Sequence, residues 1–301
     1  MNLYRLTSAF IRCLLAYALL VCTQPAMAQS YWAYPQGGPT QDEMLDLATG
    51  PGNTTYSVGY FSGIGTFGGT SLGAAGLMDA MLVKYNDIGQ VLWAVRGGGA
   101  GPDKALAVSV DTAGNAYVTG FFSGTADFDT VTLTAAGNED VFVAKYDANG
   151  NLVWVTSGGG AGPDLGSGIQ HDAFGNVAIG GQFLGTSTFG STTLISATDP
   201  LTNTPSIDVL IARLDSTGNF TWVQQGAAPF TDRALDVTMG AAGEVFAIGQ
   251  FSDTITSVIP HDPRVSEANF GARSDKGRIW RDWFWAGSGL PPPDPRLLKR
   301  C

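Results

Sequence analysis

The chain has 301 residues, 41 of them glycine, and a formal net charge of −10 at neutral pH. Between Gln29 and Ser257 it carries 6 Lys and Arg against 21 Asp and Glu, a net charge of −15. This acidic balance disfavours nucleic acid and anionic membrane as partners.

The first 28 residues have the composition of a secretory signal peptide. Arg5 and Arg12 give a positively charged start, residues 13–21 are a short apolar run, and Ala26-Met27-Ala28 is an A-x-A cleavage site. The apolar run is shorter than the roughly 20 residues that a transmembrane helix needs. We therefore expect cleavage after Ala28, export to the periplasm or beyond, and no membrane span.

The cysteines are consistent with an exported chain that has no disulfide framework. A lipoprotein anchor would use Cys22, but Val21 stands where such an anchor normally requires a small residue. Because Cys13 and Cys22 leave with the signal peptide, the mature chain keeps only Cys301. Packing of sheet against sheet must then supply the stability.

From residue 29 to residue 256, one unit is written four times. Its tryptophans are spaced 61, 61 and 68 residues apart, at Trp32, Trp93, Trp154 and Trp222. A fixed period of this length indicates a propeller, a solenoid or another array of repeats. Three further series keep the same spacing, namely Gly59, Gly120, Gly181 and Gly249; Phe61, Phe122, Phe183 and Phe251; and Asp42, Asp103, Asp164 and Asp232.

Each unit is expected to form four short strands joined by tight turns. In the second copy we place them at residues 105–110, 116–122, 141–146 and 152–156, because of their alternating pattern and their β-branched and aromatic residues. Four such strands form one antiparallel sheet, as in a propeller blade, and leave no room for a helix. The predicted fold class is all-β, an incomplete β-propeller of about three and a half four-stranded antiparallel blades.

The predicted blades cover residues 44–96, 104–157 and 165–225, with a partial blade at 234–251. Residues 31–34 align with the last strand of a blade, which commonly completes the final blade of a closed ring. Because closure takes typically 4 to 8 blades, we expect an open arc. The longer third repeat is expected to place its extra residues in a surface loop at 197–206.

A turn sequence, D-x-x-G-N, recurs at residues 111–115, 147–151, 172–176 and 215–219. An Asp side chain bonds its own backbone two residues on, and Gly supplies the positive φ of a bulged hairpin loop. A calcium loop uses similar ligands, but it needs carboxylates at alternating positions and a distal Glu. We interpret these segments as structural turns.

Taken together, these motifs resemble a known family, the bacterial β-propeller repeat abbreviated SBBP. The resemblance covers about residues 31–256 and rests on G-N-x-Y-V-x-G-x-F-x-G at 114–124, D-x-F-V-A-K-Y-D-x-x-G at 140–150, and Trp154. It implies an extracytoplasmic scaffold on Gram-negative secreted or cell-surface proteins, often with a separate sorting or adhesive domain. It implies no catalytic residue.

The repeat stops at Ser257. Phe67, Phe128 and Phe189 predict a Phe at this position in a T-F-G context, but the chain reads Thr256-Ser257-Val258. Deleting one thymine from ACN TTC GGN gives codons for Thr, Ser and a residue such as Val. The last 44 residues also hold 8 of the 16 Lys and Arg and 3 of the 7 Trp. We therefore hypothesise a frameshift, natural or from sequencing, that makes residues 257–301 an aberrant tail; the alternative is a genuine basic tail.

One series of candidate site residues keeps step with the repeat. Asp42, Asp103, Asp164 and Asp232 stand where each blade begins. In a ring they are candidates to line one mouth of the channel and to bind cations or a basic partner. The alternative, which we favour, is that these side chains cap turns.

The remaining polar and aromatic series have structural interpretations. Lys84, Lys145 and Arg213 are expected to face solvent or to pair with Asp79, Asp140 and Asp208, which adds roughly 0 to 1 kcal/mol per pair. The Trp and Phe series are expected to fill the core between blades. His171 has no Cys or His partner in its segment and His261 lies in the aberrant tail, so we expect no metal site.

The main functional interpretation is an exported scaffold with a binding or structural role at the cell surface or outside the cell, without catalysis or cofactor. Its expected ligand is a protein or a glycan. The alternative is a quinoprotein-like oxidoreductase, because residues 144–154 resemble the Trp-docking motif of quinoprotein dehydrogenases. That motif separates its Asp and Gly by three residues, whereas two separate Asp147 from Gly150. A Ser-His-Asp hydrolase is disfavoured because usable His is limited to His171.

Reading the coding DNA through codon 257 tests the frameshift, and we expect an in-frame continuation with further blades. The chain as written is expected to associate with itself through exposed blade faces and an unpaired edge at Gln250 and Phe251. A corrected, longer chain is expected to be monomeric. Light scattering compares the two, and a stable monodisperse monomer of Gln29 to Cys301 would contradict the truncation.

Overall fold

The computed structural model describes residues 36–240, 243–250, 252, 269–270 and 282–286. The signal segment, the strand expected at 31–34, and His261 lie outside the described residues. Contacts divide the chain into a unit of Met1–Ala33 and a unit of Tyr34–Cys301, and every described element belongs to the second unit.

The first repeat forms a four-stranded antiparallel sheet of β1 (Asp42–Thr49), β2 (Thr55–Phe61), β5 (Asp79–Tyr85) and β6 (Val91–Gly99). A hairpin of β3 (Ile64–Phe67) and β4 (Thr70–Gly73) lies between β2 and β5 in the chain. A three-residue 3₁₀ turn, η1 (Pro51–Asn53), joins β1 to β2. The sequence predicts no helix, and this turn is the one helical element among the described residues.

The second and third repeats follow the same order. The second sheet consists of β7 (Lys104–Val110), β8 (Ala116–Phe128), β9 (Val131–Tyr146) and β10 (Leu152–Gly160), and β8 and β9 continue through the hairpin. The third sheet consists of β11 (Leu165–His171), β12 (Val177–Leu184), β17 (Ile207–Leu214) and β18 (Phe220–Gly226), with a hairpin of β13 (Thr186–Phe189) and β14 (Thr192–Ile195). The extra residues form a small hairpin of β15 (Thr198–Asp199) and β16 (Thr204–Pro205), within the segment that the sequence predicts as a surface loop.

A fourth sheet has the strand order β19 (Arg233–Met239), β20 (Val245–Gln250), β22 (Asp282–Ala286) and β21 (Asn269–Phe270). Strand β22 takes the place of a third strand and pairs with β20 from Val245 to Gly249. The expectation of an unpaired edge is therefore wrong from Val245 to Gly249, where β20 is paired on both sides; Gln250 lies beyond the pairing with β22. The tail has no periodic pattern and is expected to carry little regular structure, but two of its described segments form β21 and β22. Phe251 lies outside the described residues.

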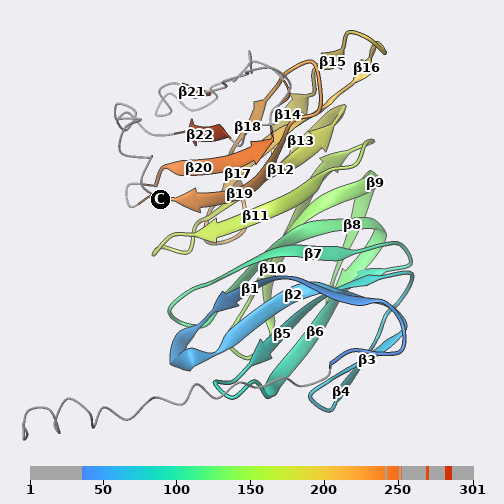
Figure 1. Ribbon diagram of the computed structural model, residues 1–301, viewed down its shortest axis with the longest axis vertical. Coiled ribbons are helices and arrows are strands. Elements are labelled where there is room, and N and C mark those ends of the chain that lie inside the picture. Colours follow the sequence, from blue (N-terminus) through green and yellow to red (C-terminus); the bar gives the residue numbers. More distant parts are fainter. Residues whose placement is uncertain (1–35, 241–242, 251, 253–268, 271–281, 287–301) are drawn as a thin grey trace, which may run out of the picture. The chain divides into compact units, whose positions relative to one another are not determined.

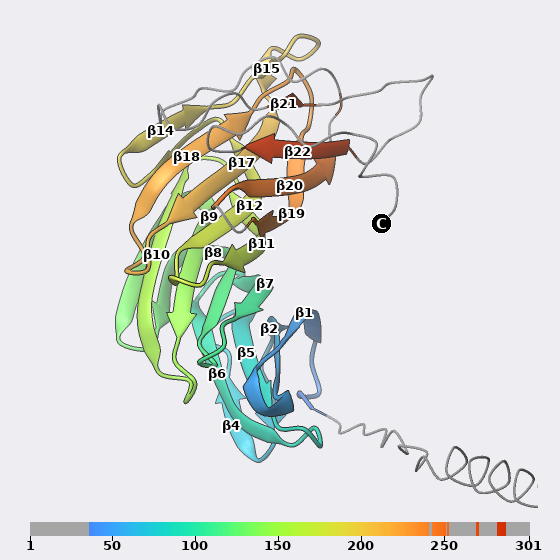
Figure 2. The ribbon, with the colours of Figure 1, turned by 90° about the vertical axis from the view of Figure 1, so that its left-hand side faces the viewer.

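The sheets succeed one another in chain order within this unit (Figures 1 and 2). The first strands of successive repeats lie next to one another: β1 lies beside β7, β7 lies beside β11, and β11 lies beside β19. The core is built between successive sheets. One buried cluster joins Val58 and Leu82 of the first sheet to Val108 and Phe142 of the second. Two further clusters join the second sheet to the third, and the third sheet to β19 and β20.

A bulge in every first strand explains one glycine series of the repeat. The register shifts at the same place in β1, β7, β11 and β19. The second strand has a glycine beside each bulge, at Gly59, Gly120, Gly181 and Gly249. A Cβ atom at any of these glycines would collide with the first strand's backbone, at a carbonyl oxygen. Glycine is therefore required for the close approach of two backbones.

The hairpin that contains Phe128 or Phe189 pairs with the last strand of the preceding repeat, and we call this contact region between two successive repeats a joint. Residues 97–99 at the end of β6 pair with residues 126–128 of β8, and the end of β10 pairs with β13 in the same way. Phe128 and Phe189 are buried, and a Cβ atom on Gly97 or Gly158 would collide with their rings. The phenylalanines of the second and third repeats thus fill the core between sheets, as the sequence predicts, whereas Phe61 and Phe67 pack within the first repeat.

Replacing Phe128 by Ala tests this docking. We expect the free energy of unfolding to fall by about 3–5 kcal/mol, because a fully buried ring leaves a cavity over Gly97. Val131 on the same hairpin is 37% exposed, and Val131→Ala is expected to change stability by only about 0.5 kcal/mol. Urea unfolding measures both; similar small losses in both variants would show that the hairpin does not hold the joint.

Candidate functional site

The aspartates that precede the first strands cap the joints between repeats. Asp103 and Asp164 are fully buried. In each, one carboxylate oxygen accepts the backbone N–H four residues earlier at 2.7 Å, and the other accepts the N–H twenty residues later, at 3.0 Å for Asp103 and 3.1 Å for Asp164. Asp232 is buried and accepts the N–H of Ser252 at 2.7 Å. Asp42 is half-buried and accepts the N–H of Gly38 at 2.5 Å.

These contacts give the series the capping role that the sequence favours. Each buried carboxylate ties the end of one repeat to the start of the next, so it is not presented to solvent. No group of three or more His, Cys, Asp and Glu side chains in the described residues is arranged to hold a metal ion. Ligand binding by this series stays a prediction.

The D-x-x-G-N segments form the structural turns predicted from the sequence. Asp147 Oδ1 accepts the backbone N–H groups of Asn149 at 2.8 Å and of Asn151 at 2.9 Å, and Asp215 makes the same pair of bonds. The hydroxyl of Thr217 and the turn amides lower the pKa of Asp215 to about 2. The carboxylates of Asp147 and Asp215 thus accept hydrogen bonds from the backbone of their own turns.

The cations of the third strands, as far as the structure describes them, contact groups other than Asp79, Asp140 and Asp208. Lys84 is buried, and its ammonium donates to the carbonyl of Ala148 at 2.8 Å in the next repeat. Lys145 lies over the ring of Tyr117 at 4.9 Å, and Arg213 pairs with Asp172 at 3.1 Å. The sequence prediction of solvent-facing cations is wrong for Lys84, because this side chain reaches across to a turn carbonyl.

Two tryptophans cross the joints, and they are half-buried where the sequence predicts burial. The indole N–H of Trp93 donates to the carbonyl of Ala148 at 3.2 Å, and that of Trp154 donates to Ser216 at 3.1 Å. Each ring covers the glycine of a turn in the next repeat. A Cβ atom on Gly150 would lie 2.9 Å from the Trp93 ring, and one on Gly218 would lie 2.8 Å from the Trp154 ring.

His171 takes part in packing. Its ring stacks on that of Tyr117, with 5.2 Å between centroids, and its Nδ1 lies 2.7 Å from the Ser109 hydroxyl. Burial lowers the pKa of His171, so the ring is neutral at neutral pH.

A hollow of about 340 Å³ opens at the joint between the first and second sheets. It is lined by Arg96 from β6, Asp127 from the end of β8, Asp129 just beyond it, and Tyr146 from the end of β9. Its volume falls within the range of roughly 300–1,000 Å³ that small-ligand sites occupy. This is the candidate functional site.

The hollow offers acceptors and donors together. Asp127 and Asp129 are exposed carboxylates, and Asp127 accepts the Thr132 hydroxyl at 2.6 Å. The side chain of Arg96 is 35% exposed and is held by Asp79 at 2.6 Å. Tyr146 is 95% buried. Burial and the charge of Asp129 raise the pKa of Tyr146, so the hydroxyl remains a donor.

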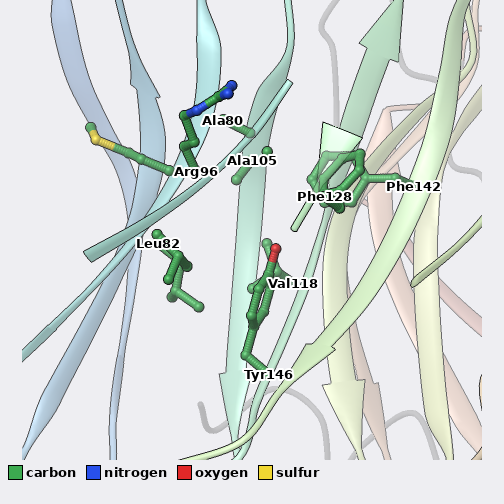
Figure 3. Close-up of a pocket in the computed structure, with 11 residues that line it drawn as sticks. Ala80, Leu82, Arg96, Ala105, Val118, Phe128, Phe142 and Tyr146 are labelled. Atoms are coloured by element: carbon green, nitrogen blue, oxygen red, sulfur yellow. The ribbon is translucent and has the colours of Figure 1, made fainter. Parts of the chain in front are cut away.

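A smaller cavity lies beside the hollow and shares Arg96 and Tyr146 with it. Figure 3 shows Phe128, Phe142 and Tyr146 among the side chains around it. Its volume of about 10 Å³ is at the lower limit for a single water molecule. The cavity is therefore part of the core packing and has no room for a ligand.

The hollow was not predicted from the sequence, although the repeat contains a signal for it. Residues 127–129 read D-F-D, whereas the other copies read T-F-G at 66–68 and 188–190. Asp129 has φ of 54°, in the left-handed region that Gly68 and Gly190 occupy at the same position. Asp tolerates this conformation better than most residues other than glycine, so the chain keeps the turn while it exchanges glycine for a carboxylate. Arg96 departs as well, because Ser157 and Gln225 occupy its position in the later repeats.

Comparison with known proteins supports the repeat architecture. No family model matches the chain. A similar protein is an uncharacterized WD repeat-containing protein of Acanthamoeba polyphaga mimivirus, 24% identical over 201 residues, which are 58% of this chain. The chain spans 14% of the length of that relative. WD repeats are propeller blades, so the similarity and the antiparallel all-β sheets are both consistent with a β-propeller-like fold.

Two glycine substitutions test the tryptophan docking. Gly218 and Gly185 have φ of 89° and 81°, so alanine at either is expected to cost roughly 1 kcal/mol of backbone strain. Gly218→Ala is expected to lose a further 1–3 kcal/mol or so, because its Cβ meets the Trp154 ring, whereas Gly185 faces open space. Urea unfolding gives both values. Equal losses would show that Trp154 does not dock tightly on the turn.

Proposed function

We propose that the chain is an exported β-propeller-like scaffold, of the SBBP type, that binds a ligand outside the cytoplasm and performs no catalysis. The hollow at the first joint is the proposed binding site. The observation that carries the proposal is that the repeat breaks where the hollow lies: Arg96, Asp127 and Asp129 replace the residues used at the same positions elsewhere.

The charges favour a ligand with a basic group. The carboxylates of Asp127 and Asp129 are exposed, whereas the charge of Arg96 is balanced by Asp79. A lysine or arginine side chain of a partner protein satisfies both carboxylates, and charge-assisted hydrogen bonds are the stronger class. The surrounding acidic chain adds long-range attraction for such a partner.

The proposed location rests on the sequence. The A-x-A segment before Gln29 supports export, and the resemblance to SBBP repeats supports a secreted or cell-surface protein of a Gram-negative bacterium. Within the described residues, no helix has the length and apolar character to cross a membrane.

The quinoprotein-like alternative rests on the likeness of residues 144–154 to a Trp-docking motif. The contact of Trp93 with Gly150 and Ala148 is a packing contact between repeats, and a binding scaffold needs it equally. A purified chain that takes up pyrroloquinoline quinone, detected by its absorbance, would favour the oxidoreductase.

A substitution to the residues of the other repeats tests the binding site. The double variant Asp127→Thr, Asp129→Gly restores T-F-G, so it is expected to keep the free energy of unfolding within about 1 kcal/mol of wild type. The probe is Nα-acetyl-arginine amide, followed by NMR at the indole N–H of Trp93, whose ring covers Gly150 at the rim of the hollow. We expect saturable shifts in wild type and at least a tenfold weaker response in the double variant.

Asp87→Asn is the matched control, because it removes one exposed charge in a turn of the first repeat away from the hollow. It is expected to bind as wild type does. A response that falls equally in the control would show that only the net charge matters. Saturable binding of N-acetylglucosamine, with no response to the arginine probe, would replace the basic ligand by a glycan.

A further inference from the structure

A pair of buried aspartates recurs at each joint between successive sheets. One member lies on the third strand of a repeat, and the other immediately precedes the first strand of the next repeat. All six side chains are at most 3% exposed. The pairs are Asp79 with Asp103, Asp140 with Asp164, and Asp208 with Asp232.

In the second pair, both carboxyl groups face one small volume beside Gly159. A Cβ atom on Gly159 would lie 2.6 Å from Asp140 Oδ1 and 2.8 Å from Asp164 Oδ2. The charge of Asp140 acts on Asp164 through this volume. Two negative charges held this closely, and both away from water, are unfavourable unless something neutralises one of them.

The first pair has such a neutralising group. Arg96 donates to Asp79 Oδ2 at 2.6 Å, and the Ala75 N–H contacts both oxygens of Asp79. In the second repeat, Ser157 stands at the position of Arg96. No cation therefore reaches Asp140 from that position.

Asp140 is left with one unpartnered oxygen. Its Oδ2 accepts the Ala136 N–H at 3.0 Å, whereas its Oδ1 has no hydrogen-bond partner among the described residues, although the side chain is 97% buried. In the third repeat, Asp208 differs, because the Ala197 N–H and the Ser206 hydroxyl serve its two oxygens at 2.7 and 3.0 Å. Asp79 has an arginine donor and Asp208 has a hydroxyl donor, whereas Asp140 has neither, and its Oδ1 is left without a partner among the described residues.

Asp164 is fully engaged as an acceptor. Its Oδ2 accepts the Gly160 N–H at 2.7 Å, and its Oδ1 accepts the Leu184 N–H at 3.1 Å and the Ser187 hydroxyl at 2.9 Å. Three donors aimed at one carboxylate stabilise its ionised form. The unpartnered Oδ1 of Asp140 is consequently the place for a proton.

We propose that the Asp140–Asp164 pair binds one proton at neutral pH, carried on Asp140 Oδ1 and donated toward Asp164, in the role that Arg96 has at the first joint. The proton converts two repelling carboxylates into a hydrogen-bonded acid and carboxylate. The joint between the second and third repeats therefore depends on pH. At the first pair, burial raises the pKa of Asp103 to about 6, and the charge of Arg96 opposes this rise.

Within the described part of the chain, the groups that bond the pair are backbone amides and the Ser187 hydroxyl, none of them charged. Ser157 and Gly160 come from β10, Leu184 from β12 and Ser187 from β13. Glu139, next to Asp140 on β9, has its side chain on the other face of the strand. Burial raises the pKa of Asp164 to about 7 and also raises the pKa of Asp140. Because the groups interact, these values belong to the pair.

The sign of the pH effect follows from linkage. An unfolded Asp releases its proton near pH 3.9, whereas burial raises the pKa of both folded carboxyl groups, that of Asp164 to about 7. Between these values the folded state binds more protons, so stability is greatest at the acidic end and falls as the pH rises to about 7. Above that pH the proton no longer contributes to the free energy of unfolding.

The test compares wild type with Asp140→Asn, whose amide donates permanently toward Asp164. Urea unfolding gives the folding equilibrium constant of each chain from pH 5 to pH 8. We expect the wild-type constant to fall relative to that of the variant by about tenfold or more over this range, since one proton changes it up to tenfold per pH unit. The variant is expected to be the more stable chain at pH 8.

Two exchanges between repeats are the matched controls. Ser157→Arg supplies the second pair with the cation that the first pair has, and we expect it to flatten the pH profile as Asp140→Asn does. Arg96→Ser removes that cation from the first pair and is expected to steepen the profile. These variants use residues that the chain itself places at this position.

Carbon-13 NMR of the wild-type carboxyl groups gives a readout that does not depend on any variant folding. We expect one proton to leave the pair near pH 7. Full ionisation of both groups below pH 5 would overturn the proposal, as would parallel pH profiles for wild type and Asp140→Asn. A rise in wild-type stability at pH 8 with millimolar calcium chloride, absent in Asp140→Asn, would overturn it in favour of a metal ion.

Discussion

The close approach of backbones at each joint is the constraint on which the rest of this structure depends. Residues 97–99 and 158–160 carry no side chains, so the hairpin of the next repeat lies directly on them and buries its phenylalanine there. The tryptophan of the earlier repeat then covers a turn glycine of the later one. Each sheet is stabilised by its neighbours, because the buried clusters span two sheets.

Most of the fold follows from the repeat, and the reason is physical. The alternating strands, the turn aspartates and the glycines opposite the bulges are local requirements, so they recur with the period and can be predicted from it. The partner of Lys84 could not be predicted in this way, because the carbonyl of Ala148 lies in another repeat. The half-buried state of Trp93 depends likewise on a neighbouring sheet. Strand β22 was missed because the tail has no periodic pattern, yet β20 offers it an edge.

The candidate site lies where the second repeat departs from the sequence of the other repeats. Asp127 and Asp129 interrupt a motif whose other copies have threonine and glycine, and the structure puts both beside Arg96 and Tyr146. Comparing the repeats in the sequence identifies Asp127 and Asp129. Their proximity to Arg96 could not be predicted in this way, because it depends on how the first sheet packs against the second. The same departure at Arg96 separates the first aspartate pair from the second. The residues that recur at the joints thus serve packing, whereas the departures from the repeat bring charged groups together.

Amide hydrogen exchange across one joint tests the central claim most directly. We expect the amides of Gly97 and Phe128, which lie where β6 pairs with β8, to exchange as slowly as those of the central strands β5 and β9. All would then open in one cooperative unfolding of both repeats. Exchange at the joint that is much faster than in the strands would show that each sheet is stable alone, and would contradict the account.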